Sequence, residues 1–393
     1  MLALINFVAS SMRFWPDKAL KPRMHNQRKK MIKKWIVIPL LLVLTMYGVI
    51  YTMDTWVPFL QRLKPKTEIV IDKATQKEAI NTLIAKLNAH YVYPEKARQM
   101  EVVLRQHLRE GKYEKITDGE EFADRLTDDL RGVSRDLHMM VHSSPEEVPY
   151  DRDVPPPPAS KAEWERRTPL ARRLLLDLGL GLGKAGVAKV DHLSSNIGYL
   201  KLPDFPPGFV MAERYAAAMD KLADTDGLIV DLRENGGGDP ATVALLISYF
   251  VDQPTRVNDM WDRTSGITTQ RWTVDKLDGK RYGGRKPIVI LVGPNTKSAG
   301  EDFAYTMQAL KRATVIGEPT WGGAHPSRPY RLGDHFAAWI PSRRAINPIT
   351  LTNWEGVGVI PDVAATQDNA LSIGKELLQR RFKELPRQIA AGR

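Results

Sequence analysis

Ser298 is the residue of this 393-residue chain whose position most favours covalent chemistry. An apolar run, Lys286–Gly293, ends just before it, and an amphipathic stretch, Glu301–Lys311, begins just after it. A strand followed by a helix would place the Ser298 hydroxyl near the first free N–H groups of the helix, where the helix dipole stabilises a developing oxyanion. The same pattern fits an ordinary helix N-cap, because Glu301 completes a capping box. The local sequence leaves both roles open for Ser298, nucleophile and cap.

A glycine-rich segment, Asp231–Gly238, could stand beside this serine. Its three consecutive glycines allow backbone conformations that a side chain would forbid, and they let peptide N–H groups approach a ligand closely. We expect the N–H groups of Gly237 and Ala299 to form an oxyanion hole for a reaction at Ser298.

The elements that must position these residues alternate between strands and helices. Apolar runs at Gly227–Leu232, Ile288–Val292 and Thr314–Gly317 predict strands buried on both faces, with helical patterns between them. This alternation indicates a layered α/β domain, which we assign to residues 171–366, followed by a carboxy-terminal helix over residues 367–393.

A smaller helical domain is predicted upstream, over residues 72–144. Ile80, Leu83 and Leu87 recur there at three- and four-residue spacing, which is typical of one apolar helix face. Residues 145–170 contain so many prolines that we expect an extended linker between the two domains.

The amino terminus predicts a membrane anchor. Trp35–Met53 carries no charge and would span roughly 28 Å as a helix, the thickness of a bilayer core. The preceding residues, 1–34, carry nine lysines and arginines against one acid, which predicts a cytoplasmic tail and a domain exported to the periplasmic or extracellular side. We favour an uncleaved single-pass anchor over a secretory signal, because no small-x-small cleavage site follows the apolar run.

Charge and composition exclude several other classes of protein. Most of the net charge of +11 lies in the amino-terminal tail, so a basic face for nucleic acid is not predicted. The chain has no cysteine, which rules out disulfides and thiolate metal sites, and its histidines lack metal-ligand spacing. We therefore predict no metal and no other cofactor.

Four segments together resemble the tail-specific, carboxy-terminal processing serine peptidase family. They are Asp231–Gly238, the Ser298-Ala-Gly-Glu sequence, Arg312–Thr320 and Trp354–Asp362. The nearer likeness is to the branch related to interphotoreceptor retinoid-binding protein and to tricorn-type peptidases, and it covers roughly residues 75–365. The resemblance implies a helical amino-terminal domain joined to a crotonase-like α/β domain, with the nucleophile at Ser298.

The base that would activate Ser298 departs from one pattern of the family. Many of its processing peptidases carry a lysine about twenty-five residues after the serine, which serves as the base in a Ser-Lys variant of the catalytic triad. In this chain the corresponding residue is Gly323, so that lysine is missing. Lys297 is a poor substitute, because adjacent side chains diverge.

The resemblance to tricorn-type peptidases implies a different relay. It places the base at His138 and the residue that orients it at Glu355. His325 is the alternative base, because it lies two residues after the position of the missing lysine. Both histidines could instead make structural hydrogen bonds, so the sequence leaves the base open.

Two functions follow from this reasoning. The first is an anchored, exported serine hydrolase, a peptidase that acts on a peptide or protein substrate through an acyl-enzyme at Ser298. The second is a non-catalytic binding protein for apolar ligands, as in the retinoid-binding relatives. The missing lysine favours the second function, whereas the ordered set of motifs favours the first.

Overall fold

The computed structural model describes residues 69–148, 162–163, 166 and 186–391, with side chains up to residue 384. The predicted tail and membrane anchor lie outside the described residues, as does most of the predicted linker. Among the described residues, no helix is both long enough and apolar enough to cross a bilayer. Anchoring and export therefore stay predictions.

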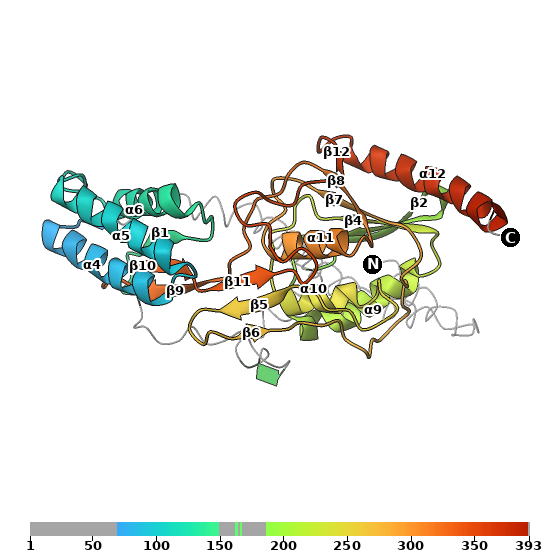
Figure 1. The fold of residues 1–393 in the computed structure, drawn as a ribbon, viewed down its shortest axis with the longest axis horizontal. Coiled ribbons are helices and arrows are strands. Elements are labelled where there is room, and N and C mark those ends of the chain that lie inside the picture. The colour runs from blue at the N-terminus through green and yellow to red at the C-terminus, as the bar shows by residue number, and fades with distance from the viewer. Residues whose placement is uncertain (1–68, 149–161, 164–165, 167–185, 392–393) are drawn as a thin grey trace, which may run out of the picture. The chain divides into compact units, whose positions relative to one another are not determined.

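A six-stranded sheet contains the three predicted buried strands and is parallel except at one edge (Figure 1). Its strand order is β12-β8-β7-β4-β3-β2, and only β2 runs antiparallel to its neighbour. In chain order the strands are β2 (Lys189–Leu193), β3 (Ile197–Lys201), β4 (Gly227–Asp231), β7 (Ile288–Val292), β8 (Thr314–Gly317) and β12 (Val363–Ala364).

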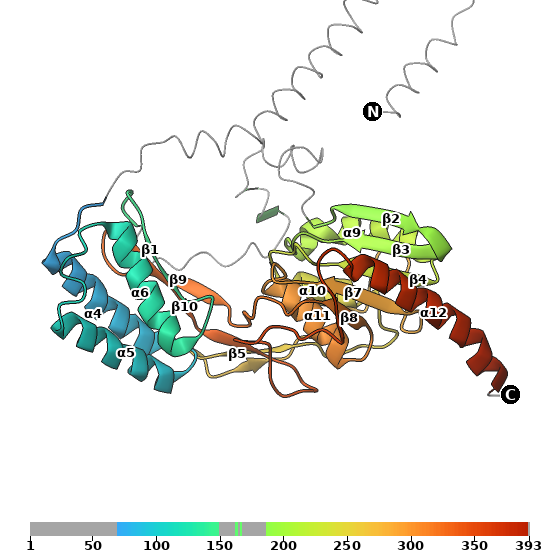
Figure 2. The same ribbon diagram turned by 90° about the horizontal axis from the view of Figure 1, so that it is seen from above.

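Helices cover both faces of this sheet. Side chains of β7 alternate between the faces, so Ile288 and Ile290 join one core, whereas Val289 and Leu291 join another. The first core is completed by α9 (Gly208–Leu222), α10 (Pro240–Ile247) and α11 (Ala299–Ala309). The second is completed by α12 (Ala370–Ala391), which lies along the sheet in Figure 2.

The predicted amino-terminal helical region consists of three helices and one strand. They are α4 (Lys73–His90), α5 (Pro94–Arg109), α6 (Gly119–Ser134) and β1 (Met140–Ser143). Asp118 is the N-cap of α6, since its carboxylate accepts the Glu121 N–H at 2.8 Å. Together with the central sheet, these helices confirm the predicted α/β fold with a helical amino-terminal region.

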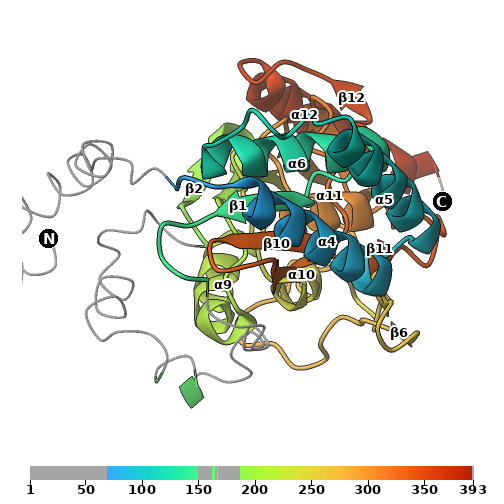
Figure 3. The same cartoon turned by 90° about the vertical axis from the view of Figure 1, so that its left-hand side faces the viewer.

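The helical region does not complete its core by itself. Strand β1 pairs with β10 (Phe336–Pro341), which pairs in turn with β9 (Ser327–Arg331). Figure 3 shows β10 behind the helices. The buried Phe336 ring packs against Phe122 of α6 at 5.6 Å between centroids. A hairpin from late in the chain therefore belongs to the same core as residues from its beginning.

A third sheet follows directly from that hairpin. Strand β11 (Arg343–Ile346) pairs with β5 (Asp259–Asp262), which pairs with the short β6 (Thr268–Thr269). All described residues fall within one compact unit, Lys66–Arg393.

Candidate active site

Ser298 is the N-cap of α11, at the turn that follows the carboxyl end of β7. Its backbone has φ 49° and ψ −111°, which is unusual for a residue with a side chain. Such a conformation costs about 1–3 kcal/mol and persists only where surrounding contacts enforce it. The strand-to-helix turn leaves Ser298 partly exposed, a position suited to a nucleophile.

The buried carboxylate of Glu301 enforces this turn. Its Oε2 accepts the N–H of Ser298 at 2.8 Å and the N–H of Gly323 at 3.0 Å. Its Oε1 accepts the Thr320 hydroxyl and the Gly322 N–H, both at 2.6 Å. Burial raises the pKa of Glu301, and the four hydrogen bonds oppose that shift. The predicted capping residue thus also holds the loop 320–323 against the nucleophile turn.

The glycine-rich segment after β4 lies directly beside Ser298. Asn235 joins the two segments, since its backbone oxygen accepts the Lys297 N–H at 2.8 Å. A Cβ on Gly237 would lie 2.9 Å from the Ser298 Cβ, and a Cβ on Gly300 would lie 2.5 Å from Asn235 Oδ1. Neither approach leaves room for a side chain, which explains these two glycines.

The two predicted oxyanion donors differ in their availability. The Ala299 N–H forms no hydrogen bond with any described residue. The Gly237 N–H donates to Asn235 Oδ1 at 2.9 Å, so it would have to leave that acceptor to bind an oxyanion. Ala299 is therefore the donor that is free in this structure.

His138 lies in the turn that follows α6. The Arg131 guanidinium fixes this turn by donating to the carbonyl oxygens of Leu137 and Met139, each at 2.8 Å. The His138 ring packs edge-on against Trp321, with 4.8 Å between centroids. It thereby contacts the loop that Glu301 holds beside Ser298.

Gly323 explains why the lysine pattern is absent here. A Cβ at this position would lie 2.3 Å from the Trp321 ring and 2.5 Å from His138 Cε1. Any side chain at residue 323, a lysine included, would collide with the His138 ring as it stands. Lys297 does not take the lysine's place, because its Nζ lies over the Trp321 ring, 5.7 Å from the centroid.

Four side chains form a carboxylate–imidazole cluster, which consists of Asp136, His138, His325 and Glu355. A ring nitrogen of His138 and one carboxyl oxygen each of Asp136 and Glu355 all lie within 4.8 Å of one another. The Nδ1 of His325 lies 2.9 Å from Asp136 Oδ2 and 3.3 Å from Glu355 Oε2. Glu355 Oε2 also accepts the Ala324 N–H at 2.6 Å.

Burial sets the protonation of this cluster. It lowers the pKa of His138 to about 4, although the Asp136 charge works against the shift, so the imidazole is neutral at neutral pH. Burial, reinforced by the Asp136 charge, raises the pKa of Glu355 to about 9, so that residue is a neutral acid. Three buried atoms of this cluster have no hydrogen-bond partner among the described residues: His138 Nδ1, His325 Nε2 and Glu355 Oε1.

The predicted site residues thus form two groups. Ser298, Gly237 and Ala299 lie together, and His138, His325 and Glu355 lie together. The groups meet at the loop 320–323, but no hydrogen bond joins Ser298 Oγ to either histidine among the described residues. A catalytic bond from His138 would have to form when substrate binds.

Sequence reasoning missed two members of the site. Asp136 was not predicted as a site residue, although it contacts both His325 and Tyr91. Glu301 entered only as a helix cap. Its three-residue spacing from Ser298 was the available signal, but its bonds to Thr320 and Gly322 span about twenty residues of sequence and carry no local pattern.

Comparison with known proteins agrees with this geometry. The model of peptidase family S41 matches residues 196–365, and that of the N-terminal domain of peptidase S41 in eukaryotic IRBP matches residues 61–170. The first match contains all four segments on which the predicted resemblance rests.

Two curated relatives illustrate the extent of the similarity. Carboxyl-terminal-processing peptidase 2, chloroplastic, from Arabidopsis thaliana is 29% identical over 169 residues, 43% of this chain and 32% of that protein. The tricorn protease of Thermoplasma volcanium is 28% identical over 141 residues, 36% of this chain and 12% of that protein. The chain spans less than half the length of these relatives.

A solved structure shares the fold over a larger part of the chain. A lipoprotein from Streptococcus agalactiae superposes with a TM-score of 0.50 at 15% sequence identity, covering 78% of this chain and 96% of that one. At this identity the likeness concerns the fold alone.

Gly323→Ala tests the packing of His138 against the loop. The added methyl group would overlap the rings of Trp321 and His138, so we expect the free energy of unfolding to fall by about 1–3 kcal/mol. Gly333→Ala is the matched control, because a Cβ there meets nothing within 4 Å. Urea unfolding measures both variants, and equal stabilities would contradict the packing described.

Glu355→Gln tests the neutral state of that carboxyl. A folded-state pKa of about 9 lies above the ordinary glutamate value, so the carboxyl's contribution to stability is full at low pH and is lost as the pH rises through about 9. Between about pH 6 and about pH 9, we expect the free energy of unfolding of the wild type to fall by more than about 1 kcal/mol relative to that of Glu355→Gln. Urea unfolding across this range would reject the assignment if the two profiles run parallel.

Proposed function

Because the chain belongs to peptidase family S41, we propose that it is a serine peptidase that cleaves peptide bonds through an acyl-enzyme at Ser298. The family match confirms the predicted resemblance. The observation that carries the proposal is the strained turn at Ser298. Hydrogen bonds to Glu301 connect this turn to the loop 320–323, and the same loop packs against His138.

The proposed reaction begins with attack of Ser298 Oγ on the substrate carbonyl carbon. The base accepts the hydroxyl proton as the new C–O bond forms, and the Ala299 N–H stabilises the developing oxyanion at the positive end of α11. The base then donates its proton to the leaving amine. Water hydrolyses the resulting acyl-enzyme by the same route in reverse.

We assign the base to His138. Its neutral imidazole can accept a proton. Its ring packs against Gly323, and the Glu301 carboxylate accepts hydrogen bonds from the N–H groups of both Gly323 and Ser298. His325 is almost completely buried, and its Nδ1 is engaged by Asp136 and Glu355. That environment suits a positioning residue, so His325 orients the two carboxyl groups.

The carboxyl groups have separate proposed roles. Asp136 accepts the backbone N–H of His138 at 3.1 Å and is the charge that favours the protonated imidazole. It would stabilise the imidazolium that forms during the reaction. Glu355, as a neutral acid, would hold Asp136 and His325 in place, in line with the orienting role predicted for it.

Exposed apolar side chains favour a substrate peptide with apolar residues. Ile349, Leu351 and Val357 are each more than half exposed and flank the Trp354–Glu355 segment. The Gly356 N–H donates to the Gly322 carbonyl at 2.9 Å, which places Val357 next to the loop at the active site. Apolar side chains of a bound peptide would cover these groups.

Labelling with a fluorophosphonate probe tests the nucleophile and the base. We expect the wild type to be labelled, Ser298→Ala to be unlabelled, and His138→Gln to react more slowly by about 100-fold or more. The labelling rate should fall less in His325→Gln than in His138→Gln, because His325 only positions the carboxyl groups of Asp136 and Glu355. His142→Gln replaces an exposed histidine of β1 and is the control.

Three results would contradict the proposal or one of its assignments. Equal labelling of the wild type and Ser298→Ala would exclude Ser298 as the nucleophile. A wild-type labelling rate for His138→Gln, together with a much lower labelling rate for His325→Gln, would assign the base to His325 instead. Absence of labelling in every form, with a retained apolar ligand, would instead support the non-catalytic binding protein.

A further inference from the structure

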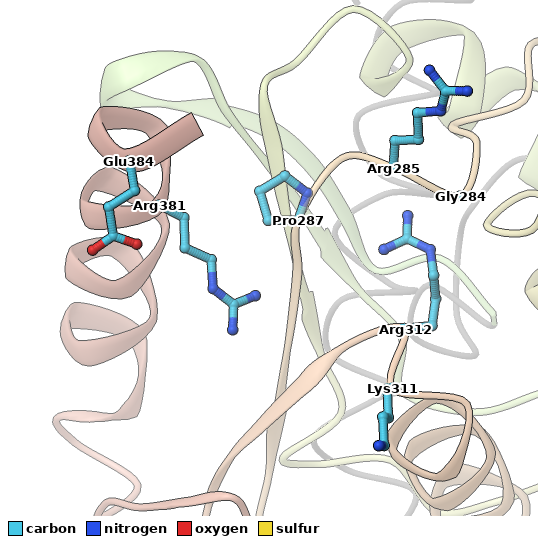
Figure 4. A pocket seen from close by; sticks show the side chains of 7 residues that line it. All are labelled: Gly284, Arg285, Pro287, Lys311, Arg312, Arg381 and Glu384. Carbon is cyan, nitrogen blue, oxygen red and sulfur yellow. The ribbon is translucent and has the colours of Figure 1, made fainter. Parts of the chain in front are cut away.

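A basic cavity lies at one end of the central sheet (Figure 4). Its volume is about 330 Å³, and the charged side chains that line it are Arg285, Lys311, Arg312, Arg381 and Glu384. Pro287, also in the lining, immediately precedes β7, and Arg312 stands two residues before β8. The cavity is therefore at the amino ends of these strands, whereas Ser298 follows the carboxyl end of β7.

The arginines of this cavity use only part of their hydrogen-bonding capacity. Arg312 donates through Nε to the Phe250 carbonyl and through one terminal nitrogen to the Gly283 carbonyl, each at 2.6 Å. Arg381 donates one hydrogen bond, to Thr314 Oγ1 at 2.7 Å. A guanidinium has five N–H donors, so each arginine keeps donors for a ligand.

The positive charge of the cavity is only partly offset by the carboxylates of Glu384, in its lining, and Asp252, which acts on Arg312. None of its four cations forms an ion pair with a carboxylate of the described residues. In Figure 4 Arg381 extends from α12 toward the cavity, whereas the Glu384 carboxylate points away from that guanidinium. The nearby Asp252 accepts the Gly284 N–H at 2.8 Å. Arg312 and Arg381 are partly buried, whereas Arg285 and Lys311 are exposed. A partly buried guanidinium without an ion-pair partner is costly, and a bound anion would reduce that cost for Arg312 and Arg381.

We propose that this cavity binds a small ligand that carries a phosphate group. A guanidinium group can donate two parallel hydrogen bonds to two oxygens of one phosphate, and the excess of four cations over one carboxylate in the lining favours an anionic ligand. The volume lies near the lower end for small-molecule sites, which suits a phosphate ester. The phosphate could belong to a free ester or to a phospholipid headgroup, which share this chemistry.

Calorimetric titration of the full chain in detergent tests the site with three probes. They are inorganic pyrophosphate, glycerol 3-phosphate as a free monoester, and glycerophosphoglycerol as the diester of a lipid headgroup. Arg381→Gln removes one cavity cation and a single hydrogen bond to Thr314. Arg380→Gln is the matched control, because it removes the same charge from the adjacent, exposed position of α12 outside the cavity.

We expect at least one probe to bind and Arg381→Gln to weaken its binding by about tenfold, with Arg380→Gln close to the wild type. Preference for the monoester identifies a free phosphate ester, and preference for the diester identifies a headgroup. Equal weakening by both substitutions, or no binding of any probe, overturns the proposal. The labelling of Ser298 is measured separately, so failure of either proposal is recognised independently.

Discussion

The active site depends on one buried carboxylate, that of Glu301. Removing a carboxylate from water costs several kcal/mol, and four hydrogen bonds to Ser298, Thr320, Gly322 and Gly323 offset that cost. These donors come from two segments separated by more than twenty residues. The carboxylate is satisfied only when the nucleophile turn and the loop 320–323 meet, so the strained backbone of Ser298 is stabilised by contacts that also form the site.

The second constraint is the absence of a side chain at Gly323. The space that a side chain would occupy is taken by the rings of His138 and Trp321, so a lysine at this position and the present histidine exclude each other. His138 and Asp136 come from the helical region, whereas His325 and Glu355 come from loops of the α/β region. The cluster exists only when these two regions pack together, and the β9–β10 hairpin helps to hold them in one core.

Local sequence predicted the parts of this structure that local chemistry determines. The strands β4, β7 and β8 and the cap at Ser298 follow from apolar runs and from capping residues. The pairing of β1 with β10 joins positions about two hundred residues apart, and the spacing of apolar residues along the sequence cannot predict such a contact. The same holds for Asp136 and His325, whose contact at 2.9 Å is set by tertiary packing. The structure brings His138 and Glu355 into one cluster, and the resemblance could not reveal the protonation of either side chain.

The account is tested most directly by the reactivity of Ser298 in Glu301→Gln. This change keeps the shape of the side chain but replaces one acceptor oxygen with an NH₂ group, so two of the four donors face another donor. We predict that fluorophosphonate labelling slows by about 100-fold or more, while circular dichroism stays that of a folded protein. Glu376→Gln, an exposed change on α12, should react like the wild type. A folded Glu301→Gln variant that is labelled at the wild-type rate would contradict the account.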